Sequence, residues 1–317
     1  MTAVHDQPVP RASGPILVTG GAGFIGGHVV RELLAQGHEV RVIDDCSTGR
    51  REVVPEGVAF TETSILDRGA LALAAAGAAA IVHLAAVVSV PESIDDPRRC
   101  WRVNVDGTHE VIEAARPAGA RVVLASSCSI YGEGGHPRRE DEPPAPASPY
   151  AASKAAAEAL CIGAARSLGI TAACLRFFNV IGPGQRADSG YAAVLAAFTD
   201  AVRRGEPCRI DGDGGQTRDF VSVHDVARAV RLAATAPDLE AEVLNVATGR
   251  ETSIRELARL VAAAAGRADE PTFGPERAGD LRRSVGDATR ARERLGFEAD
   301  RTVDEIVADV VIASDAE

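Results

Sequence analysis

The chain has 317 residues and a formal net charge of −11 at neutral pH. Hydrophobic residues make up 46% and charged residues 25% of the sequence, which is typical of a globular protein with a large core. Nucleic acids and anionic membrane surfaces are bound through basic patches, so this acidic balance argues against both partners.

The N-terminal residues 1–14 are rich in small and polar residues, and we expect a disordered lead-in. No stretch approaches roughly eighteen apolar residues without a glycine or a charge, so no membrane-spanning segment is expected. The six cysteines show neither a CxxC pair nor metal-ligand spacing. We therefore expect no metal, reduced thiols and a cytoplasmic location.

Short apolar segments alternate with helical patterns over the first part of the chain. The segments expected to form strands are 16–18, 39–44, 79–85, 121–126 and 171–177, and those expected to form helices are 24–37, 104–119 and 151–169. Strands that are apolar on both faces and alternate with helices are typical of a parallel sheet. The sequence therefore predicts an α/β fold with a Rossmann-type, doubly wound parallel sheet over residues 15–178.

From about residue 179 the pattern becomes looser. Glycine-rich loops at 179–191 and 209–220 are followed by helical patterns at 222–236 and 253–266, the second opened by a capping box of Ser253 and Glu256. We expect residues 179–218 and 248–317 to form a smaller substrate-binding lobe, while residues 219–247 return to the first domain. Ligands of open α/β sheets bind at the carboxyl ends of the strands, which this lobe would face.

A glycine-rich turn follows the first strand and opens the first helix. Gly20 permits the tight turn, Gly23 lets the backbone approach a pyrophosphate, and Gly26 lets the helix pack close to the strand. Because the three glycines occur in a strand–turn–helix context, they predict a dinucleotide-binding site.

Asp44 ends the second predicted strand, where a carboxylate can accept both hydroxyl groups of an adenosine ribose. Together with Asp45 it would repel a 2′-phosphate, although Arg50 or Arg51 could bind one. The sequence therefore favours NAD over NADP, and residues 15–178 are predicted to be an NAD-binding domain.

Lys154 is the only lysine in the chain and lies four residues after Tyr150, one of three tyrosines. On a helix the two side chains share a face. A phenol, with an ordinary pKa of about 10, needs a nearby positive charge to act as a base at neutral pH. The compact ammonium group supplies that charge, so Tyr150 can exchange a proton while hydride moves to or from a nicotinamide. Ser127, at the end of the preceding strand, can hold the reacting oxygen.

With these residues in place, the chain resembles the extended short-chain dehydrogenase/reductase family, and within it the nucleotide-sugar epimerases and dehydratases. The resemblance runs from about residue 15 to 300. Its motifs are "TGGAGFIG" at 19–26, "HLAA" at 83–86, "NVDGT" at 104–108, "SSCSIYG" at 126–132, "SPYAASK" at 148–154, "RFFNVIGPGQ" at 176–185 and "GDGGQTRDFVSVHDVA" at 212–227.

The resemblance implies three groups of site residues. The catalytic residues are Ser127, Tyr150 and Lys154. The cofactor-binding residues are Gly20, Gly23, Phe24, Ile25, Gly26, Asp44, Ser64, Ile65, Leu84, Ala85, Ala86, Asn104, Tyr150 and Lys154, with Ser64 standing where the family commonly has an aspartate that contacts adenine. The substrate-binding residues are Ser89, Ser129, Asn179, Arg186, Tyr191, Arg218, Arg277 and Asp280, of which Arg218 and Arg277 suit the charges of a diphosphate.

The implied activity is 4-epimerisation of a UDP-hexose by an isomerase of carbohydrate metabolism that keeps NAD bound. Hydride leaves carbon four, a transient 4-keto sugar turns over, and hydride returns to the opposite face. UDP-glucuronate is favoured because Arg186 and Ser129 could pair with its carboxylate. UDP-glucose, UDP-galactose and their N-acetyl forms are close alternatives, the last admitted by the small Ser284. The helices at 98–116 and 150–169 would pair across a two-fold axis in a homodimer.

Two other functions stay open at this point. A 4,6-dehydratase of the family carries an acidic pair directly after the catalytic serine or threonine, where this chain has Cys128 and Ser129, and a 5,6-dehydratase could use a reactive Cys128. A non-catalytic NAD-binding sensor would need no tyrosine–lysine pair. Retention of Lys154 in a chain whose other basic residues besides histidine are arginines counts against it.

Overall fold

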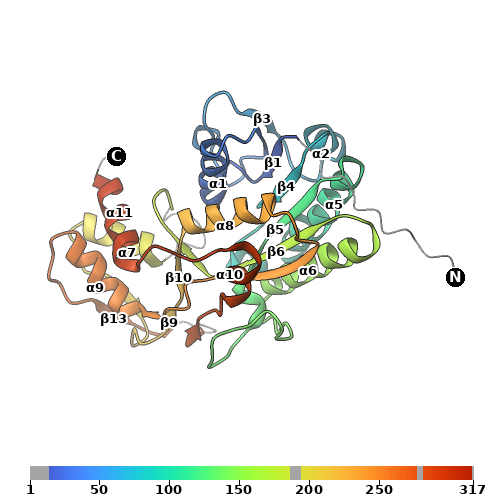
Figure 1. The fold of residues 1–317 in the computed structure, drawn as a ribbon. Helices are drawn as coiled ribbons and strands as arrows, with labels where there is room; N and C mark the ends of the chain where they lie inside the picture. Colours follow the sequence, from blue (N-terminus) through green and yellow to red (C-terminus); the bar gives the residue numbers. More distant parts are fainter. Residues whose placement is uncertain (1–13, 186–193, 277–280, 316–317) are drawn as a thin grey trace.

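The computed structural model describes residues 14–185, 194–276 and 281–315. Within these residues, seven parallel strands form the central sheet in the order β11-β6-β5-β4-β1-β2-β3 (Figure 1). The strands are β1 (Ile16–Thr19), β2 (Val40–Asp44), β3 (Ala59–Glu62), β4 (Ala80–His83), β5 (Arg121–Ser127), β6 (Ala172–Phe177) and β11 (Ala241–Val246). The order reverses at β1, and this confirms the predicted Rossmann-type fold, whose ligands bind at the point of reversal.

Helices cover both faces of the sheet, which explains why its strands are apolar on both sides. Helices α1 (Phe24–Ala35) and α8 (Val223–Thr235) pack on one face, where Val18 and Val82 lie in their core. Helices α2 (Arg68–Ala75), α5 (Gly107–Ala118) and α6 (Pro149–Ser167) cover the other face, where Leu17 and Ile81 are buried (Figure 1). Adjacent residues of a strand therefore enter different cores.

A second, smaller lobe lies beside the carboxyl end of the sheet (Figure 1, left). Its core is formed by α7 (Val194–Arg203), α9 (Ile254–Ala264) and α11 (Val303–Asp315). Phe198, Leu257 and Ile306, one from each helix, belong to the same buried hydrophobic cluster. Short strands complete it: β8 (Arg209–Asp211) pairs with β13 (Thr272–Gly274), and β9 (Thr217–Arg218) lies between β12 (Thr252–Ser253) and β14 (Arg283–Ser284).

The chain passes between the two parts more than once. Strands β7 (Asn179–Ile181) and β10 (Phe220–Ser222) pair in parallel, after which α8 returns to α1 and β11 adds to the sheet beside β6. Helix α10 (Thr289–Leu295) contributes Ala291 to the same core as α8. We propose on these contacts that the domains divide at 15–178, 179–218, 219–247 and 248–317. Of the predicted lead-in at 1–14, only Gly14 lies among the described residues.

The predicted helix at 98–116 is divided in the structure. Helix α4 (Pro97–Trp101) is followed by a π-helical segment, Arg102–Asp106, and then by α5. Such single π turns are short and rare, so the apolar periodicity of the surrounding helix does not predict one. The segment contains the buried Asn104, and a short helix, α3 (Val90–Asp95), precedes α4.

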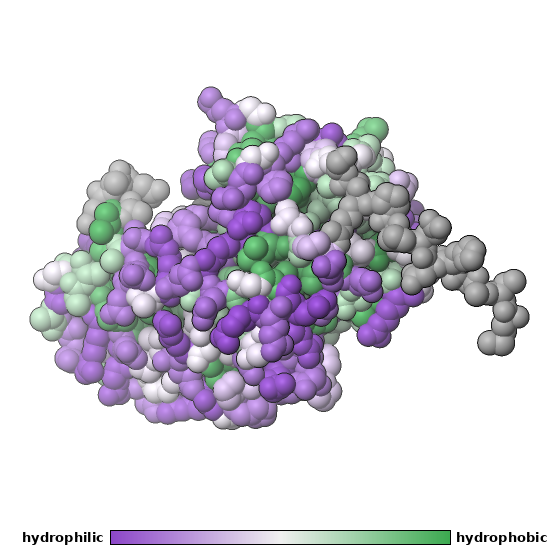
Figure 2. All heavy atoms as spheres, viewed as in Figure 1, coloured by the Kyte–Doolittle hydropathy of each residue, from purple (hydrophilic) through white to green (hydrophobic). Residues whose placement is uncertain are grey.

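Figure 2 shows a predominantly hydrophilic face with small, separate apolar areas, as the charged composition leads one to expect. Among the described residues, no helix has the length and apolar character to cross a bilayer. In the same part of the chain, no group of three or more His, Cys, Asp or Glu side chains could hold a metal ion. All six cysteines are described and are free thiols.

Candidate functional site

The glycine-rich turn between β1 and α1 is shaped for close approach of a ligand. Gly20 has φ +73°, and a Cβ there would lie 2.6 Å from the Ala85 nitrogen. A Cβ on Gly26 would lie 2.1 Å from the Gly20 carbonyl oxygen, so this glycine sets the distance between helix and strand. A Cβ on Gly23 would have one described atom within 4 Å, the Gly20 carbonyl oxygen at 3.3 Å, so the space around this residue is open.

The N-terminus of α1 has the features of a phosphate-binding helix. Its first turn contains no acidic side chain. The N-cap residue is Gly23, which has no side chain that could cap the helix. Backbone N–H groups in the first turn of a helix lack intrahelical partners and favour an anion. The space above Gly23 and this helix end therefore fit the pyrophosphate of a dinucleotide.

Asp44 lies at the carboxyl end of β2 and braces the glycine turn. Its Oδ2 accepts from the Ala22 nitrogen at 2.9 Å, and its Oδ1 accepts from the Cys46 nitrogen at 2.8 Å. Burial raises the pKa of this carboxyl. Arg51 is held elsewhere, stacked 4.5 Å from the ring centroid of Phe60. An acidic group at the ribose position with Arg51 engaged in this way fits NAD better than NADP.

The end of β4 forms the opposite side of the turn. The Leu84 nitrogen donates to the Thr19 carbonyl at 3.1 Å, and the Ala85 nitrogen donates to the Thr19 hydroxyl at 3.3 Å. Ala86 follows and is half-buried, as are Leu84 and Ala85. Ser64 lies in the loop after β3, where its hydroxyl accepts from the Leu66 nitrogen at 3.3 Å. The adjacent Ile65 is buried in the core beneath α5.

His83, at the end of β4, belongs to a buried hydrogen-bond chain. Its Nδ1 lies 2.8 Å from the Thr19 hydroxyl and its Nε2 lies 3.1 Å from the Thr108 hydroxyl, which donates to the Asn104 carbonyl at 2.6 Å. Because the Thr108 proton is committed, His83 donates through Nε2 and accepts at Nδ1. Burial lowers its pKa to about 3, so the ring is neutral and has a structural role.

Asn104 uses its whole amide group inside the protein. Its Oδ1 accepts from the Val87 nitrogen at 2.8 Å, while its Nδ2 donates to the Val87 carbonyl and to the Ser153 hydroxyl, both at 2.9 Å. It therefore joins the loop after β4 to α6, one residue before Lys154. A direct hydrogen bond from Asn104 to the cofactor stays a prediction. Its hydrogen bonds to Val87 and Ser153 show that it holds the loop after β4 against α6.

The three predicted catalytic residues lie on two adjoining elements. Ser127 is the last residue of β5, and Tyr150 and Lys154 lie one turn apart near the start of α6. The Lys154 Nζ donates to the Ala125 carbonyl at 3.0 Å and lies 6.0 Å from the ring centroid of Tyr150. The Tyr150 nitrogen donates to the Ser93 hydroxyl at 3.1 Å, which ties the start of α6 to α3.

The ammonium of Lys154 lies in an enclosed environment. The residue is only 5% exposed, and burial lowers the pKa of Lys154 to about 8. The protonated form therefore still predominates at neutral pH. A cation partly stripped of water interacts more strongly with a neighbouring phenolate than one in bulk water does. This arrangement can lower the cost of ionising a phenol and can donate hydrogen bonds to a ribose.

Tyr131 is poorly suited to proton transfer at neutral pH. Its ring is 1% exposed, its hydroxyl donates to Asn245 Oδ1 at 2.6 Å, and burial raises its pKa to about 12. It serves as a structural residue, so Tyr150 is the described tyrosine that can exchange a proton.

The predicted substrate residues are distributed over the lobe and the loops beside the sheet. Asn179 donates through Nδ2 to the Asp219 carbonyl at 3.1 Å, and Arg218 donates through Nη1 to the Leu281 carbonyl at 2.7 Å. Ser89 is buried and caps α3 by accepting from the Glu92 nitrogen at 3.1 Å. Four predicted residues lie outside the described residues: Arg186, Tyr191, Arg277 and Asp280.

Two residues directly after Ser127 bear on the chemistry. The Cys128 thiol lies 3.8 Å from the Ser284 hydroxyl, and burial raises its pKa to about 11. It is therefore a protonated thiol at neutral pH, a poor acid–base group and a poor nucleophile. The Ser129 hydroxyl is buried and has no hydrogen-bond partner among the described residues.

Sequence reasoning missed a buried ion pair that lies one helical turn beyond Lys154 on α6. Glu158, on α6, is 5% exposed and pairs with Arg176 of β6, which is 3% exposed, at 2.8 Å. The signal was available, because Glu158 lies four residues after Lys154 and shares a helix face with it. Its partner could not be read from spacing, since Arg176 comes from a different strand.

A helix N-terminus open to phosphate and a buried amine beside a phenol are found together in enzymes that move hydride with a nicotinamide dinucleotide. The fold and site thus define an enzyme of the short-chain dehydrogenase/reductase class. Residues 16–247 match the NAD dependent epimerase/dehydratase family, and the chain belongs to that family. NAD is accordingly its cofactor.

Individual relatives agree with this membership. The chain is 43% identical over 304 residues to a UDP-glucose 4-epimerase of Mycolicibacterium smegmatis, covering 93% of this chain and 96% of the relative. It superposes on UDP-glucose 4-epimerase of Thermotoga maritima, solved with UDP-glucose, with a TM-score of 0.91 and 37% identity, covering 95% and 99% of the two chains. MoeE5, solved with UDP-glucuronic acid and NAD, gives a TM-score of 0.87 and 36% identity, covering 96% and 99%.

Replacing Gly26 by alanine tests the role of the glycine turn. The new Cβ would lie 2.1 Å from the Gly20 carbonyl oxygen, so α1 must move away from β1. We expect the free energy of unfolding to fall by about 2 kcal/mol or more and NAD to bind more weakly. Chemical denaturation and a fluorescence titration with NAD measure both.

Gly163→Ala is the matched control, because a Cβ at this position in α6 meets no described atom within 4 Å. It should raise the free energy of unfolding by about 0.5–1 kcal/mol and leave NAD binding unchanged. Wild-type stability and NAD affinity in the Gly26→Ala variant would contradict the assigned role of the turn.

Proposed function

We propose that the protein is a UDP-sugar 4-epimerase that works with bound NAD. The observation that carries this proposal is the buried Lys154 ammonium, whose Nζ lies 6.0 Å from the Tyr150 ring centroid. Both residues lie on α6, which packs against β5, the strand that ends at Ser127. The 4-epimerase relatives that span the length of this chain support the same reaction.

The residues divide the chemistry as follows. NAD, when bound, supplies a reversible acceptor for the hydride of sugar carbon four. Tyr150 removes the hydroxyl proton at that carbon, and Lys154 stabilises the phenolate that accepts it. The Ser127 hydroxyl hydrogen-bonds the reacting oxygen. The product of this step would be a transient 4-keto sugar. If this sugar rotates in the site before the hydride returns to carbon four on the opposite face, the epimer forms without net oxidation.

The dehydratase alternative lacks its acid–base pair in the described residues. The position after Ser127 holds Cys128, a protonated thiol at neutral pH, and the next holds Ser129, a neutral hydroxyl. Elimination of water across carbons five and six needs groups that change protonation near neutral pH. Neither residue does so, which favours epimerisation.

Proton NMR of the wild-type enzyme with UDP-glucose, UDP-glucuronate or UDP-N-acetylglucosamine tests the function. We expect the 4-epimer to accumulate and kcat to fall as the pH rises through about 8, because the Lys154 ammonium loses its proton there. Lys154→Arg should lower kcat about 100-fold or more, since a planar guanidinium fits the site poorly, and should lose the alkaline decline.

The outcomes separate the alternatives. A 6-deoxy-4-keto or unsaturated product would identify a dehydratase, and NAD binding without turnover of any sugar nucleotide would identify a sensor. Undiminished turnover by Lys154→Arg would overturn the mechanism.

For the sugar itself we propose UDP-glucuronate. The enclosed Ser129 hydroxyl has no hydrogen-bond partner among the described residues and can donate to a carboxylate. The predicted partner Arg186 would supply the charge. MoeE5 was solved both with UDP-glucuronic acid and with UDP-glucose, and the M. smegmatis and T. maritima relatives make UDP-glucose the second candidate.

Ser129→Ala separates these two substrates. We expect kcat/KM for UDP-glucuronate to fall about tenfold, because a hydrogen bond to a charged group is lost, and kcat/KM for UDP-glucose to change about twofold or less. Paired initial-rate measurements with both substrates give the comparison. Equal losses, or a wild-type preference for UDP-glucose, would refute the glucuronate preference and leave the epimerase proposal standing.

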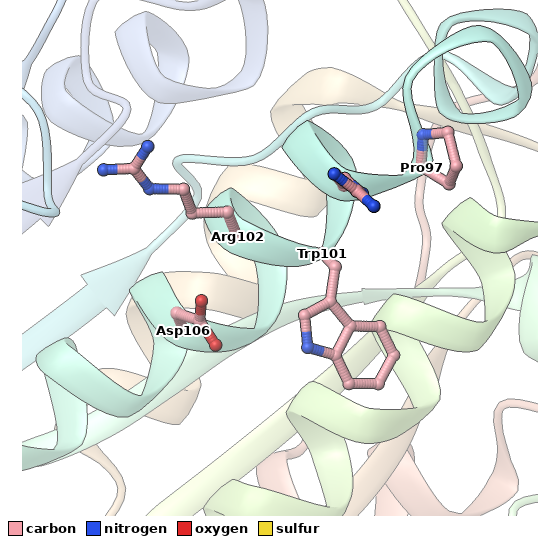
Figure 3. A pocket seen from close by; sticks show the side chains of 5 residues that line it. Pro97, Trp101, Arg102 and Asp106 are labelled. Atoms are coloured by element: carbon pink, nitrogen blue, oxygen red, sulfur yellow. The ribbon is translucent and has the colours of Figure 1, made fainter.

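We propose further that the enzyme is a cytoplasmic homodimer paired through α4–α5 and α6. Support comes from an open hollow of about 410 Å³ lined by Pro97, Arg98, Trp101, Arg102 and Asp106 (Figure 3). Trp101 in this hollow is 48% exposed, which is unusual for so large an apolar side chain. The free thiols fit a reducing compartment.

Sedimentation velocity tests the dimer. We expect a species of twice 32.9 kDa for the wild type and a shift towards the single chain in Trp101→Asp, because a carboxylate would be buried at the interface. Phe273→Asp, at an exposed position in β13 of the smaller lobe, serves as the control and should stay dimeric. A wild-type protein that sediments as a single chain would refute the homodimer.

A further inference from the structure

We propose that Glu158 is a positioning residue for the reaction: together with Ser126 and Arg176 it fixes α6 against the end of β5, so that Tyr150 and Lys154 face Ser127. This inference rests on the proposed function, because it assigns a task in the same proton transfer. Glu158 itself lies behind the catalytic residues and acts through them.

The carboxylate of Glu158 is fully used in buried hydrogen bonds. Its Oε1 accepts from the Ser126 hydroxyl at 2.5 Å and from Arg176 Nε at 2.9 Å, and its Oε2 accepts from Arg176 Nη2 at 2.8 Å. The bidentate geometry with Arg176 fixes direction as well as distance. The group therefore specifies one orientation of α6 relative to the strands.

These bonds continue a series of contacts between β5 and α6. The Ala125 carbonyl accepts from Lys154, and the next residue, Ser126, donates to Glu158 one helical turn further on. Ser127 follows on the strand, and Tyr150 lies one turn before Lys154. Two adjacent strand residues are thus attached to two consecutive turns of the helix, which sets its position along its axis.

Arg176 extends the attachment to the neighbouring strands. Its guanidinium lies 4.7 Å from the ring centroid of Tyr131, whose hydroxyl donates to Asn245 of β11. Buried ion pairs seldom stabilise a fold more than apolar residues of the same volume do. Stability alone therefore does not account for this pair, whereas a requirement for one exact orientation of α6 does.

The same carboxylate acts on the charge of Lys154. The titratable groups near the amine are Tyr150, Glu158 and Cys161 on α6, Cys100 on α4, and the neutral His83 on β4. Burial lowers the pKa of Lys154, and the negative charge of Glu158 opposes that effect. Loss of the carboxylate would leave Arg176 uncompensated and would lower the pKa further.

The single lysine permits a direct test. Protein labelled with ¹⁵N- and ¹³C-lysine contains one labelled side chain, so its NMR titration reports Lys154 alone. In Glu158→Gln we expect the pKa of Lys154 to fall by about one unit. We also expect kcat to fall about tenfold or more with KM within about twofold, because displaced catalytic groups affect the transition state more than binding.

Variants separate positioning from stability. Glu158→Asp keeps the charge and should restore the pKa of Lys154 towards the wild-type value. Glu32→Gln removes a half-buried carboxylate that pairs with Arg231 at 2.7 Å between α1 and α8, and should lower stability without moving the Lys154 pKa. If Glu158→Gln does not fold, Ser126→Ala removes only the hydroxyl bond and should still lower kcat several-fold at unchanged KM.

The opposite results are equally distinct. A Glu158→Gln variant that loses stability but keeps the wild-type Lys154 pKa and kcat would overturn the inference, as would an unaltered kcat in Ser126→Ala. A wild-type enzyme that turns over no UDP-sugar would instead overturn the proposed function, while the Lys154 titration would still report whether Glu158 controls the charge of the amine.

Discussion

A protonated amine in a nearly water-free pocket is the constraint on which the rest of the site depends. Lys154 is 5% exposed, and the fold must keep it charged while denying it solvent. The Ala125 carbonyl, the Tyr150 ring and the nearby Glu158 carboxylate together replace part of the lost hydration. Each of these partners is placed by the junction of β5 and α6. The geometry of that junction therefore governs the chemistry, and the surrounding elements serve to hold it.

The junction is supported from three sides by residues that do no chemistry. Asn104 attaches the loop after β4 to Ser153, next to Lys154, and the neutral His83 bonds Thr19 to Thr108 beneath it. The Glu158–Arg176 pair attaches the other end of the catalytic turn to β6. Buried polar groups cost free energy unless they are bonded, and within this frame the Arg176 Nη1 is the one side-chain nitrogen that has no hydrogen-bond partner among the described residues. A rigid polar frame of this kind keeps reacting groups aligned while a sugar turns over.

Much of the fold was predictable because its rules are local. Apolar strands bounded by glycines, and the Gly20–Gly26 turn, specify a doubly wound sheet without knowledge of distant contacts. The lone Lys154 after Tyr150 likewise marks α6, the helix to which we assign the proton transfer. The contact between Arg176 and Glu158 was not predictable, because the two residues lie on different elements. The π-helical turn at Asn104 was not predictable either, because such turns are short and rare. The placement of Ser89 as a helix cap was missed although its signal is local, because Ser89, Pro91 and Glu92 form the pattern that opens a helix.

Asp44 has a consequence for redesign of coenzyme preference. Acceptance of a phosphorylated ribose is commonly sought by replacing the acidic residue at the end of the second strand with a neutral one. Here the same carboxylate holds the backbone of Ala22 in the glycine turn and of Cys46, which has an unusual positive φ of 53°. Its removal would release both segments at once. Engineering this enzyme towards NADP would therefore need a second change that restores the shape of the turn, with the new charge introduced only afterwards.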